Sequence, residues 1–246
     1  MLDLTQCLNS AKSAAILAGE FILNAQGTNL EVLSNTGRDL KLQLDIDTEK
    51  IIKDHISSDS SYPILGEETG LSGDLDGSYW VVDPLDGTSN FLRGIPISCV
   101  SIALMQGMQP MLGVIYDFNH DEIYWGHKES KAYINDKEIC VSSLSQKSES
   151  TLVTGIPAKT NYSDSEFSEM ISNFQAWKKI RMIGSAAMAA CYVASGKAET
   201  YKEDGIFLWD IAAGAAIVNA AGGLASITNI QTDCRVNAKF TNNIIE

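Results

Sequence analysis

The sequence has few of the residues, and none of the spacings, on which several large classes of enzyme depend. Its 246 residues include only three histidines and five cysteines, and the closest cysteines, Cys99 and Cys140, are 41 positions apart. No CxxC pair exists, which argues against a zinc or dithiol site and favours reduced thiols. The motifs GxSxG, GxxxxGK[ST], GxGxxG and HExxH are also absent. A nucleophile activated by histidine is therefore poorly supported.

Long apolar runs and excess positive charge are missing as well. No stretch approaches the ~18 apolar residues that a membrane helix requires. The first residues carry Asp3 and Lys12, where a signal peptide would have a basic start and an unbroken apolar core. The net charge is −13, from 31 acidic and 18 basic residues, which disfavours a surface for nucleic acid. We expect a cytoplasmic globular protein with no membrane or nucleic-acid partner.

The order of apolar patterns predicts a layered α/β body. Apolar residues recur at helical spacing over the first 25 or so residues, and a second helix is expected over 48–55 with Thr48 as its cap. Strand-like runs dominate from there to about residue 141, and helices alternate with strands in the second half, which closes with a strand at 224–230. The polar segment 142–150 is the candidate boundary. We expect one domain, 1–246, with lobes of about 1–141 and 150–246.

Carboxylates follow three of the apolar segments. The stretches concerned are ILGEETG, with Glu67 and Glu68; VVDPLDGTSN, with Asp83 and Asp86; and LWDIAAG, in which Asp210 stands where it would cap a helix. Two carboxylates within 4 Å repel by ~4 kcal/mol at an effective dielectric constant of ~20, so clustering them is unfavourable without a cation. Ligation by oxygen alone suits Mg²⁺, whereas the order of a calcium loop is absent.

The residues after Asp86 could hold an anion. Gly87 permits close approach of the backbone, Thr88 and Ser89 supply hydroxyl groups, and a helix is expected to begin near Thr88. Each motif alone has a plain structural explanation as a turn, a solvated loop or a helix cap. Together they favour metal-assisted transfer of a phosphoryl group to water.

These segments closely resemble the signatures of a known family. ILGEETG, WVVDPLDGTSNFLRGIPISCVSIAL and LWDIAAGAAIVNAAGG are similar to the motifs of the inositol monophosphatases, which are Mg²⁺-dependent, lithium-sensitive phosphatases. The likeness spans nearly the whole chain. It implies an α-β-α-β-α sandwich of the sugar-phosphatase type, two or three Mg²⁺ ions in each active site, and a homodimer.

The resemblance also assigns roles to individual residues. One metal would be held by Glu67, Asp83 and the backbone carbonyl of Leu85, and a second by Asp83, Asp86 and Asp210. Glu68, Thr88 and Asp45 would orient the attacking water, and the amides of Gly87 and Thr88 would hold phosphate. Ala186 and Glu203 would contact substrate hydroxyls. The segment DLKLQLDID lacks the threonine of the family, so Asp45 and Asp47 compete for one role.

The expected reaction is hydrolysis of a small phosphate monoester, such as inositol 1-phosphate or a related sugar or polyol phosphate, by metal-activated water. Glu203 favours a hydroxylated leaving group, because a carboxylate accepts hydrogen bonds but repels a second phosphate. Relatives with the same metal motifs act on fructose 1,6-bisphosphate, histidinol phosphate or 3′(2′),5′-bisphosphate nucleotides. A catalytically silent metal-binding scaffold is the rival from another class.

Overall fold

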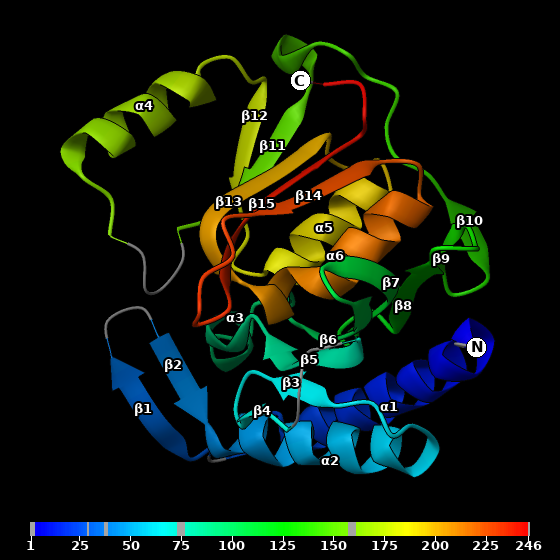
Figure 1. The fold of residues 1–246 in the computed structure, drawn as a ribbon. Coiled ribbons are helices and arrows are strands. Elements are labelled where there is room, and N and C mark those ends of the chain that lie inside the picture. Colours follow the sequence, from blue (N-terminus) through cyan, green and yellow to red (C-terminus); the bar gives the residue numbers. More distant parts are fainter. Residues whose placement is uncertain (1–2, 29, 37–38, 73–76, 157–160, 246) are drawn as a thin grey trace.

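The protein has an α/β fold in which helical layers alternate with sheets (Figure 1). The computed structural model describes residues 3–28, 30–36, 39–72, 77–156 and 161–245. Helices α1 (Leu4–Ala25) and α2 (Gln43–Asp59) cover one face of an eight-stranded sheet. Helices α5 (Ala186–Ala194) and α6 (Leu208–Ala220) lie between this sheet and a five-stranded sheet, and α4 (Asp164–Phe174) lies beyond the latter. The predicted α-β-α-β-α layering is confirmed. No helix among the described residues is long and apolar enough to cross a membrane.

The N-terminal helix, α1 (Leu4–Ala25), was predicted correctly. Asp3 caps it, because its Oδ1 accepts hydrogen bonds from the backbone amides of Thr5 and Gln6 at 3.1 and 3.0 Å. The apolar residues at helical spacing form its buried face against the sheet. These are Leu4, Leu8, Ala11, Ala15 and Ala18.

Helix α2 (Gln43–Asp59) begins five residues before the predicted start at Thr48. Thr48 does not cap it and lies buried inside the helix. The N-cap is Leu42, whose amide donates to the Asp45 carboxylate at 2.9 Å. The sequence did not indicate this start, because Leu42 has no polar side chain for capping. The capping oxygen comes instead from Asp45, at the third helical position.

The eight-stranded sheet runs in the order β10-β9-β8-β7-β6-β5-β3-β4. Its strands are β3 (Ile64–Gly66), β4 (Gly70–Leu71), β5 (Ser78–Asp86), β6 (Cys99–Gln106), β7 (Gln109–Asp117), β8 (Glu122–His127), β9 (Ala132–Ile134) and β10 (Lys137–Ile139). Along β5, Trp80 packs in the core under α1 and α2, and its neighbour Val81 packs in the core with α5 and α6. Burial on both faces explains why this strand reads as continuously apolar.

The five-stranded sheet has the order β12-β11-β13-β15-β14 and is mixed. Its strands are β11 (Thr151–Thr154), β12 (Lys179–Met182), β13 (Thr200–Phe207), β14 (Leu224–Thr228) and β15 (Arg235–Thr241). The expectation that the fold closes at 224–230 was wrong, because β15 follows and inserts between β13 and β14. Sequence analysis also missed the hairpin of β1 (Val32–Thr36) and β2 (Asp39–Leu42).

The remaining elements connect or cover these layers. They are α3 (Thr88–Leu92), the 3₁₀ turn η1 (Lys147–Glu149), α4 (Asp164–Phe174), α5 (Ala186–Ala194) and α6 (Leu208–Ala220). The segment 142–150 joins β10 of the larger sheet to β11 of the smaller one. A division into two lobes there stays a prediction.

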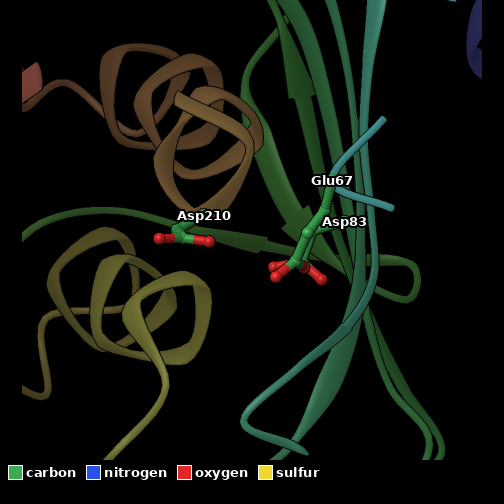
Figure 2. A group of neighbouring side chains, drawn as sticks. All are labelled: Glu67, Asp83 and Asp210. Carbon is green, nitrogen blue, oxygen red and sulfur yellow. The ribbon is translucent and has the colours of Figure 1, made fainter. Parts of the chain in front are cut away.

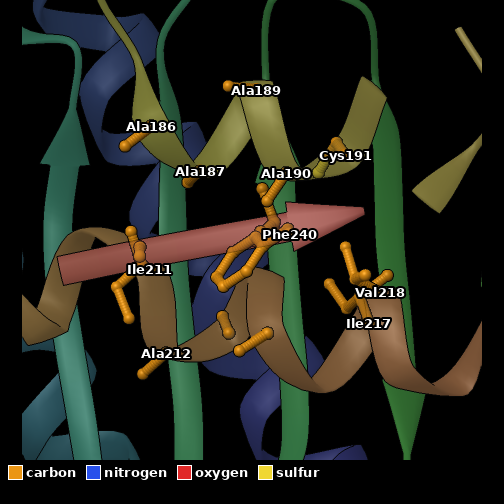
Figure 3. Packing of buried hydrophobic residues seen from close by; sticks show 14 of the residues in the cluster. Ala186, Ala187, Ala189, Ala190, Cys191, Ile211, Ala212, Ile217, Val218 and Phe240 are labelled. Atoms are coloured by element: carbon orange, nitrogen blue, oxygen red, sulfur yellow. The ribbon is translucent and has the colours of Figure 1, made fainter. Parts of the chain in front are cut away.

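Helices α5 and α6 pack closely because small residues face each other (Figure 3). A Cβ on Gly214 of α6 would lie 2.3 Å from the Ala190 Cβ of α5 and 3.6 Å from the ring of Phe240. The opposite side of α6 rests on two glycines, Gly113 of β7 and its cross-strand partner Gly126 of β8. This close packing fixes the start of α6, where Asp210 is located, against the larger sheet.

Replacing Gly113 by alanine should destabilise the protein. The added Cβ would lie 2.1 Å from the backbone oxygen of Ala213, so α6 would have to move away from the sheet. We expect a loss of ~1–3 kcal/mol in the free energy of unfolding, measured by urea denaturation. Ser226→Ala, at an exposed position of β14, serves as the control and should change the midpoint little. Equal midpoints for the Gly113→Ala variant and the parent would contradict this account of the packing.

Candidate active site

Three acidic side chains from distant parts of the sequence meet at one end of the larger sheet (Figure 2). Glu67, Asp83 and Asp210 each offer a carboxylate oxygen, and these oxygens lie within 4.8 Å of one another. Glu67 directly follows β3, and the register of the parallel strands β3 and β5 sets Gly66 beside Val82, so Glu67 and Asp83 are neighbours. Asp210 reaches them from the first turn of α6.

No ion pair to Glu67, Asp83 or Asp210 is found among the residues that the structure describes. Burial, followed by repulsion from Glu68, raises the pKa of Glu67 to about 8. Burial and the charge of Glu67 likewise raise the pKa values of Asp83 and Asp210 well above their ordinary range. Oxygen ligands at this spacing, whose charged forms are disfavoured first by burial and then by mutual repulsion, fit a hard divalent cation. Three of the acids that the sequence predicted as metal ligands therefore lie together, and metal binding by them stays a prediction.

Asp86, the fourth predicted acid, is anchored to the start of α5. Its Oδ2 accepts hydrogen bonds from the Ser185 hydroxyl at 2.5 Å and from the Ala187 amide at 2.8 Å. Burial raises its pKa to about 6, against these hydrogen bonds, which lower it. Asp86 is outside the closest trio but near enough to raise the pKa values of Glu67, Asp83 and Asp210. One oxygen thus ties α5 to the acidic cluster.

The turn after β5 is held by its own side chains. The Thr88 hydroxyl donates to the Leu85 carbonyl at 2.9 Å, and the Leu85 amide donates to Asp83 Oδ1 at 3.0 Å. Gly87 has φ of +86°, and a Cβ there would lie 2.7 Å from the Ile97 carbonyl. The predicted helix does begin at Thr88, as α3, and Ser89 is exposed beside it.

The structure distinguishes Asp45 from Asp47. Asp45 is buried, and one of its carboxylate oxygens has no hydrogen-bond partner among the described residues. Burial is the main cause that raises its pKa to about 7, and the charge of Glu68 adds to the rise. Asp47 is exposed and accepts a hydrogen bond from Gln43. Asp45, not Asp47, is therefore the one in electrostatic contact with the acids of the site.

Two residues that position this site escaped sequence analysis. Glu49 is fully buried, and its carboxylate accepts hydrogen bonds from the amides of Glu68 and Thr69 at 2.8 and 3.1 Å. Lys41 pairs with Glu68, whose side chain is 2% exposed, at 2.6 Å. The sequence does contain one indication of the role of Glu49. It follows Asp45 by four residues, which places both acids on one face of α2.

The two residues predicted to contact substrate hydroxyls lie on α5 and on β13 of the smaller sheet. Ala186 is the first residue of α5 and is buried next to Ser185. Glu203 of β13 is buried, and its Oε2 accepts a hydrogen bond from the Tyr201 hydroxyl at 3.1 Å. Burial raises the pKa of Glu203 to about 7. Charges on Asp86 and Asp210 interact with Tyr201 and Glu203, so this region faces the acidic cluster.

Comparison with known proteins identifies the family of this chain. The sequence model of the inositol monophosphatase family matches residues 3–240. The chain belongs to the inositol monophosphatase family. Membership in this family makes the chain a phosphatase, and thus a hydrolase, as the sequence predicted.

Relatives from bacteria and plants resemble the chain over most of its length. The inositol monophosphatase 1 of Solanum lycopersicum is 37% identical over 231 residues, which are 90% of this chain and 84% of that protein. The Nus factor SuhB of Xylella fastidiosa is 36% identical over 88% of this chain and 80% of that protein. The structure of the inositol monophosphatase of Anabaena superimposes with a TM-score of 0.85 at 31% identity, covering 99% and 93% of the two chains.

The raised pKa values predict how the stability of the metal-free enzyme depends on pH. Above the ordinary carboxyl pKa of about 4, the folded state holds more protons than the unfolded state, so stability falls as pH rises. The fall should extend at least to the pKa of about 8 reached by Glu67, since the pKa values of Asp83 and Asp210 are raised as well. Melting temperatures in a chelating buffer from pH 5 to pH 9 would measure this slope.

Matched variants identify the groups responsible. Glu67→Gln should flatten the slope, whereas Asp47→Asn, at an exposed site, should leave it unchanged. A melting temperature of the metal-free enzyme that rises over this interval would contradict the expected sign.

Proposed function

We propose that this protein is a Mg²⁺-dependent phosphatase that hydrolyses a small phosphate monoester, inositol 1-phosphate or a related sugar or polyol phosphate, by attack of water. The proposal is carried by one observation, the convergence of Glu67, Asp83 and Asp210 within 4.8 Å. A fold alone would not need these three acids together, because their repulsion destabilises it.

The acids divide between two or three Mg²⁺ ions in our proposal. Glu67, Asp83 and the Leu85 carbonyl would hold one, and Asp83, Asp86 and Asp210 a second. The ions supply charge stabilisation for the phosphoryl group and lower the pKa of water. The Asp45 oxygen that has no partner among the described residues would accommodate a further ion or an ordered water, because a buried carboxylate oxygen without a partner is unfavourable.

The remaining polar groups would orient water and phosphate. The Thr88 hydroxyl donates a hydrogen bond to the Leu85 carbonyl, so the lone pairs of its oxygen can accept a hydrogen bond from the attacking water. Glu68 is held by Lys41 through its side chain and by Glu49 through its backbone. The amides of Gly87 and Thr88, with the exposed Ser89, would hold the phosphate oxygens.

Glu203 would select the leaving group. Its carboxylate is fixed by Tyr201 and keeps lone pairs for substrate hydroxyl groups, with Ala186 beside it in our proposal. A pKa of about 7 means that it can also be protonated near neutral pH. This arrangement supports a polyol over a leaving group with a second phosphate. Activity on fructose 1,6-bisphosphate, histidinol phosphate or 3′(2′),5′-bisphosphate nucleotides is the alternative, and a catalytically silent scaffold is the rival.

Replacing Asp83 by asparagine tests the reaction. The change removes a charge shared by both proposed metal positions, so phosphate release should fall at least ~10³-fold while the protein stays folded. Phosphate release would be measured with Mg²⁺ across inositol phosphates, sugar bisphosphates, histidinol phosphate and bisphosphate nucleotides. Asp47→Asn is the matched control. Absence of turnover of every compound by the parent protein would favour the scaffold.

Mg²⁺ binding offers an independent readout. At ~100 times its dissociation constant, Mg²⁺ should stabilise the parent by ~2.7 kcal/mol, and Asp83→Asn should lose most of this shift. An unchanged melting temperature on adding Mg²⁺ would remove the basis of the assignment. Inhibition by lithium, a homodimeric state and a cytoplasmic location stay predictions from the family resemblance.

Replacing Glu203 by glutamine tests the leaving group. The amide keeps the shape but loses the charged acceptor, a change worth ~10- to 100-fold for a hydrogen bond to a charged group. We expect kcat/KM for inositol 1-phosphate to fall by this factor and kcat/KM for phenyl phosphate, which has no hydroxyl groups, to change less. Equal losses on both substrates would show that Glu203 does not read the leaving group.

A further inference from the structure

A cavity of about 650 Å³ lies between α4 and the five-stranded sheet. This volume is in the ~300–1,000 Å³ range of sites for small molecules. The cavity has a floor of polar sheet residues and a partly aromatic wall. Its lining includes Thr154, Thr200, Lys202, Asn237 and Lys239 from the sheet, and Tyr162, Phe174 and Trp177 from α4 and its flanks.

The cavity is on the face of the sheet that points away from α5 and α6. Tyr201 of β13, with Ala238 and Phe240 of β15, belongs to the core built with these two helices. Side chains alternate between the faces of a strand, so Lys202 and Lys239 point to the other side. Glu203, two residues after Tyr201, also borders the cavity, so the cavity reaches the proposed leaving-group region, whereas Asp210 projects from α6.

Two lysines stand directly opposite each other on this floor. The antiparallel register of β13 and β15 pairs Lys202 with Lys239. Like charges in this position destabilise a sheet. Lys202 forms an ion pair with Asp204 at 3.4 Å, and no ion-pair partner of Lys239 is found among the residues that the structure describes. An anion placed between the two ammonium groups would relieve this repulsion.

A buried hydroxyl next to the lysines points to the same kind of ligand. Thr200 is 2% exposed, borders the cavity and has no hydrogen-bond partner for its Oγ1 within the described part of the chain. It lies two residues before Lys202 on β13, and therefore on the same face of the sheet. A ligand oxygen could accept a hydrogen bond from the Thr200 hydroxyl, because a buried hydroxyl is rarely left unsatisfied.

The wall of the cavity adds apolar surface to this charged floor. Trp177 is half-buried, and the Lys147 ammonium lies 5.8 Å from the centre of its ring. Glu166 and Glu169 also border the cavity, but the Glu166 carboxylate is occupied by the amide and hydroxyl of Ser163, both at 2.7 Å. An aromatic group could therefore pack beside Trp177 while its anionic end reaches the lysines.

We propose that this cavity is a second binding site, which takes a small aromatic phosphate or phosphonate. Lys202, Lys239 and the Thr200 hydroxyl bind the anionic group, and Trp177 contacts the ring. This site goes beyond the proposed phosphatase reaction and does not depend on it.

Phenylphosphonate is a suitable probe, because its P–C bond is not the bond that a phosphate monoesterase cleaves. Binding to the Mg²⁺-loaded protein would be measured by calorimetry and by tryptophan fluorescence. We expect saturable binding that the double variant Lys202→Gln/Lys239→Gln weakens at least ~10-fold, the effect of losing a charged hydrogen bond. Lys50→Gln, at an exposed position of α2, is the matched control and should bind as the parent does.

Two further variants separate this cavity from the acidic cluster. Asp83→Asn should abolish phosphatase activity yet bind phenylphosphonate as tightly as the parent. Thr200→Val should weaken the binding without lowering the melting temperature, since it removes a hydroxyl that no described protein group satisfies. Methylphosphonate, which lacks the ring, should bind more weakly than phenylphosphonate.

Several results would overturn the proposal. These are no saturable binding to the parent, equal binding by the lysine double variant, or loss of binding in Asp83→Asn, which would locate the probe in the catalytic site. Equal affinities for phenylphosphonate and methylphosphonate would show that Trp177 does not contact the ring. None of these outcomes depends on whether inositol 1-phosphate is hydrolysed, so failure here and failure of the phosphatase assignment can be told apart.

Discussion

Mutual repulsion among clustered carboxylates is the constraint on which the rest of this structure depends. Glu67, Asp83 and Asp210 lie within 4.8 Å of one another, and each holds its proton more tightly than an ordinary carboxyl group. The fold must hold these groups together against their charge. It does so with rigid elements, since two of the acids belong to adjacent parallel strands or their ends and the third to a helix packed on glycines.

A second tier of polar groups keeps the acids in place without joining the cluster. Glu49 accepts hydrogen bonds from the loop that carries Glu67 and Glu68, and Ser185 holds Asp86. Asn90 donates from its side chain to the carbonyls of Ile97 and Ile183, both at 2.8 Å, and so links α3, after the end of β5, to the segment before α5. These hydrogen bonds therefore connect the strand ends of the larger sheet to α2 and to the start of α5.

The outer face of the smaller sheet has a different character. The inner face packs on α5 and α6 through apolar residues, whereas the outer face, beneath α4, carries the lysine pair and the Thr200 hydroxyl, which no described group satisfies. No residue of α4 is buried. The single strand β13 thus carries Glu203, proposed to contact the substrate, and Lys202, proposed to bind the second ligand, and both residues border the cavity.

The sequence by itself determined the acids, the turn after β5 and the alternation of helices and strands, because these are written in local patterns of two to four residues. Tertiary structure alone decided which acids meet. The choice between Asp45 and Asp47 depended on which one α2 buries, and the roles of Glu49 and Lys41 depended on where a distant loop lies. Strand β15 was missed because its outer residues are polar, and only pairing between β13 and β14 makes it part of the sheet. Contacts between residues far apart in the chain depend on packing, and no short pattern encodes them.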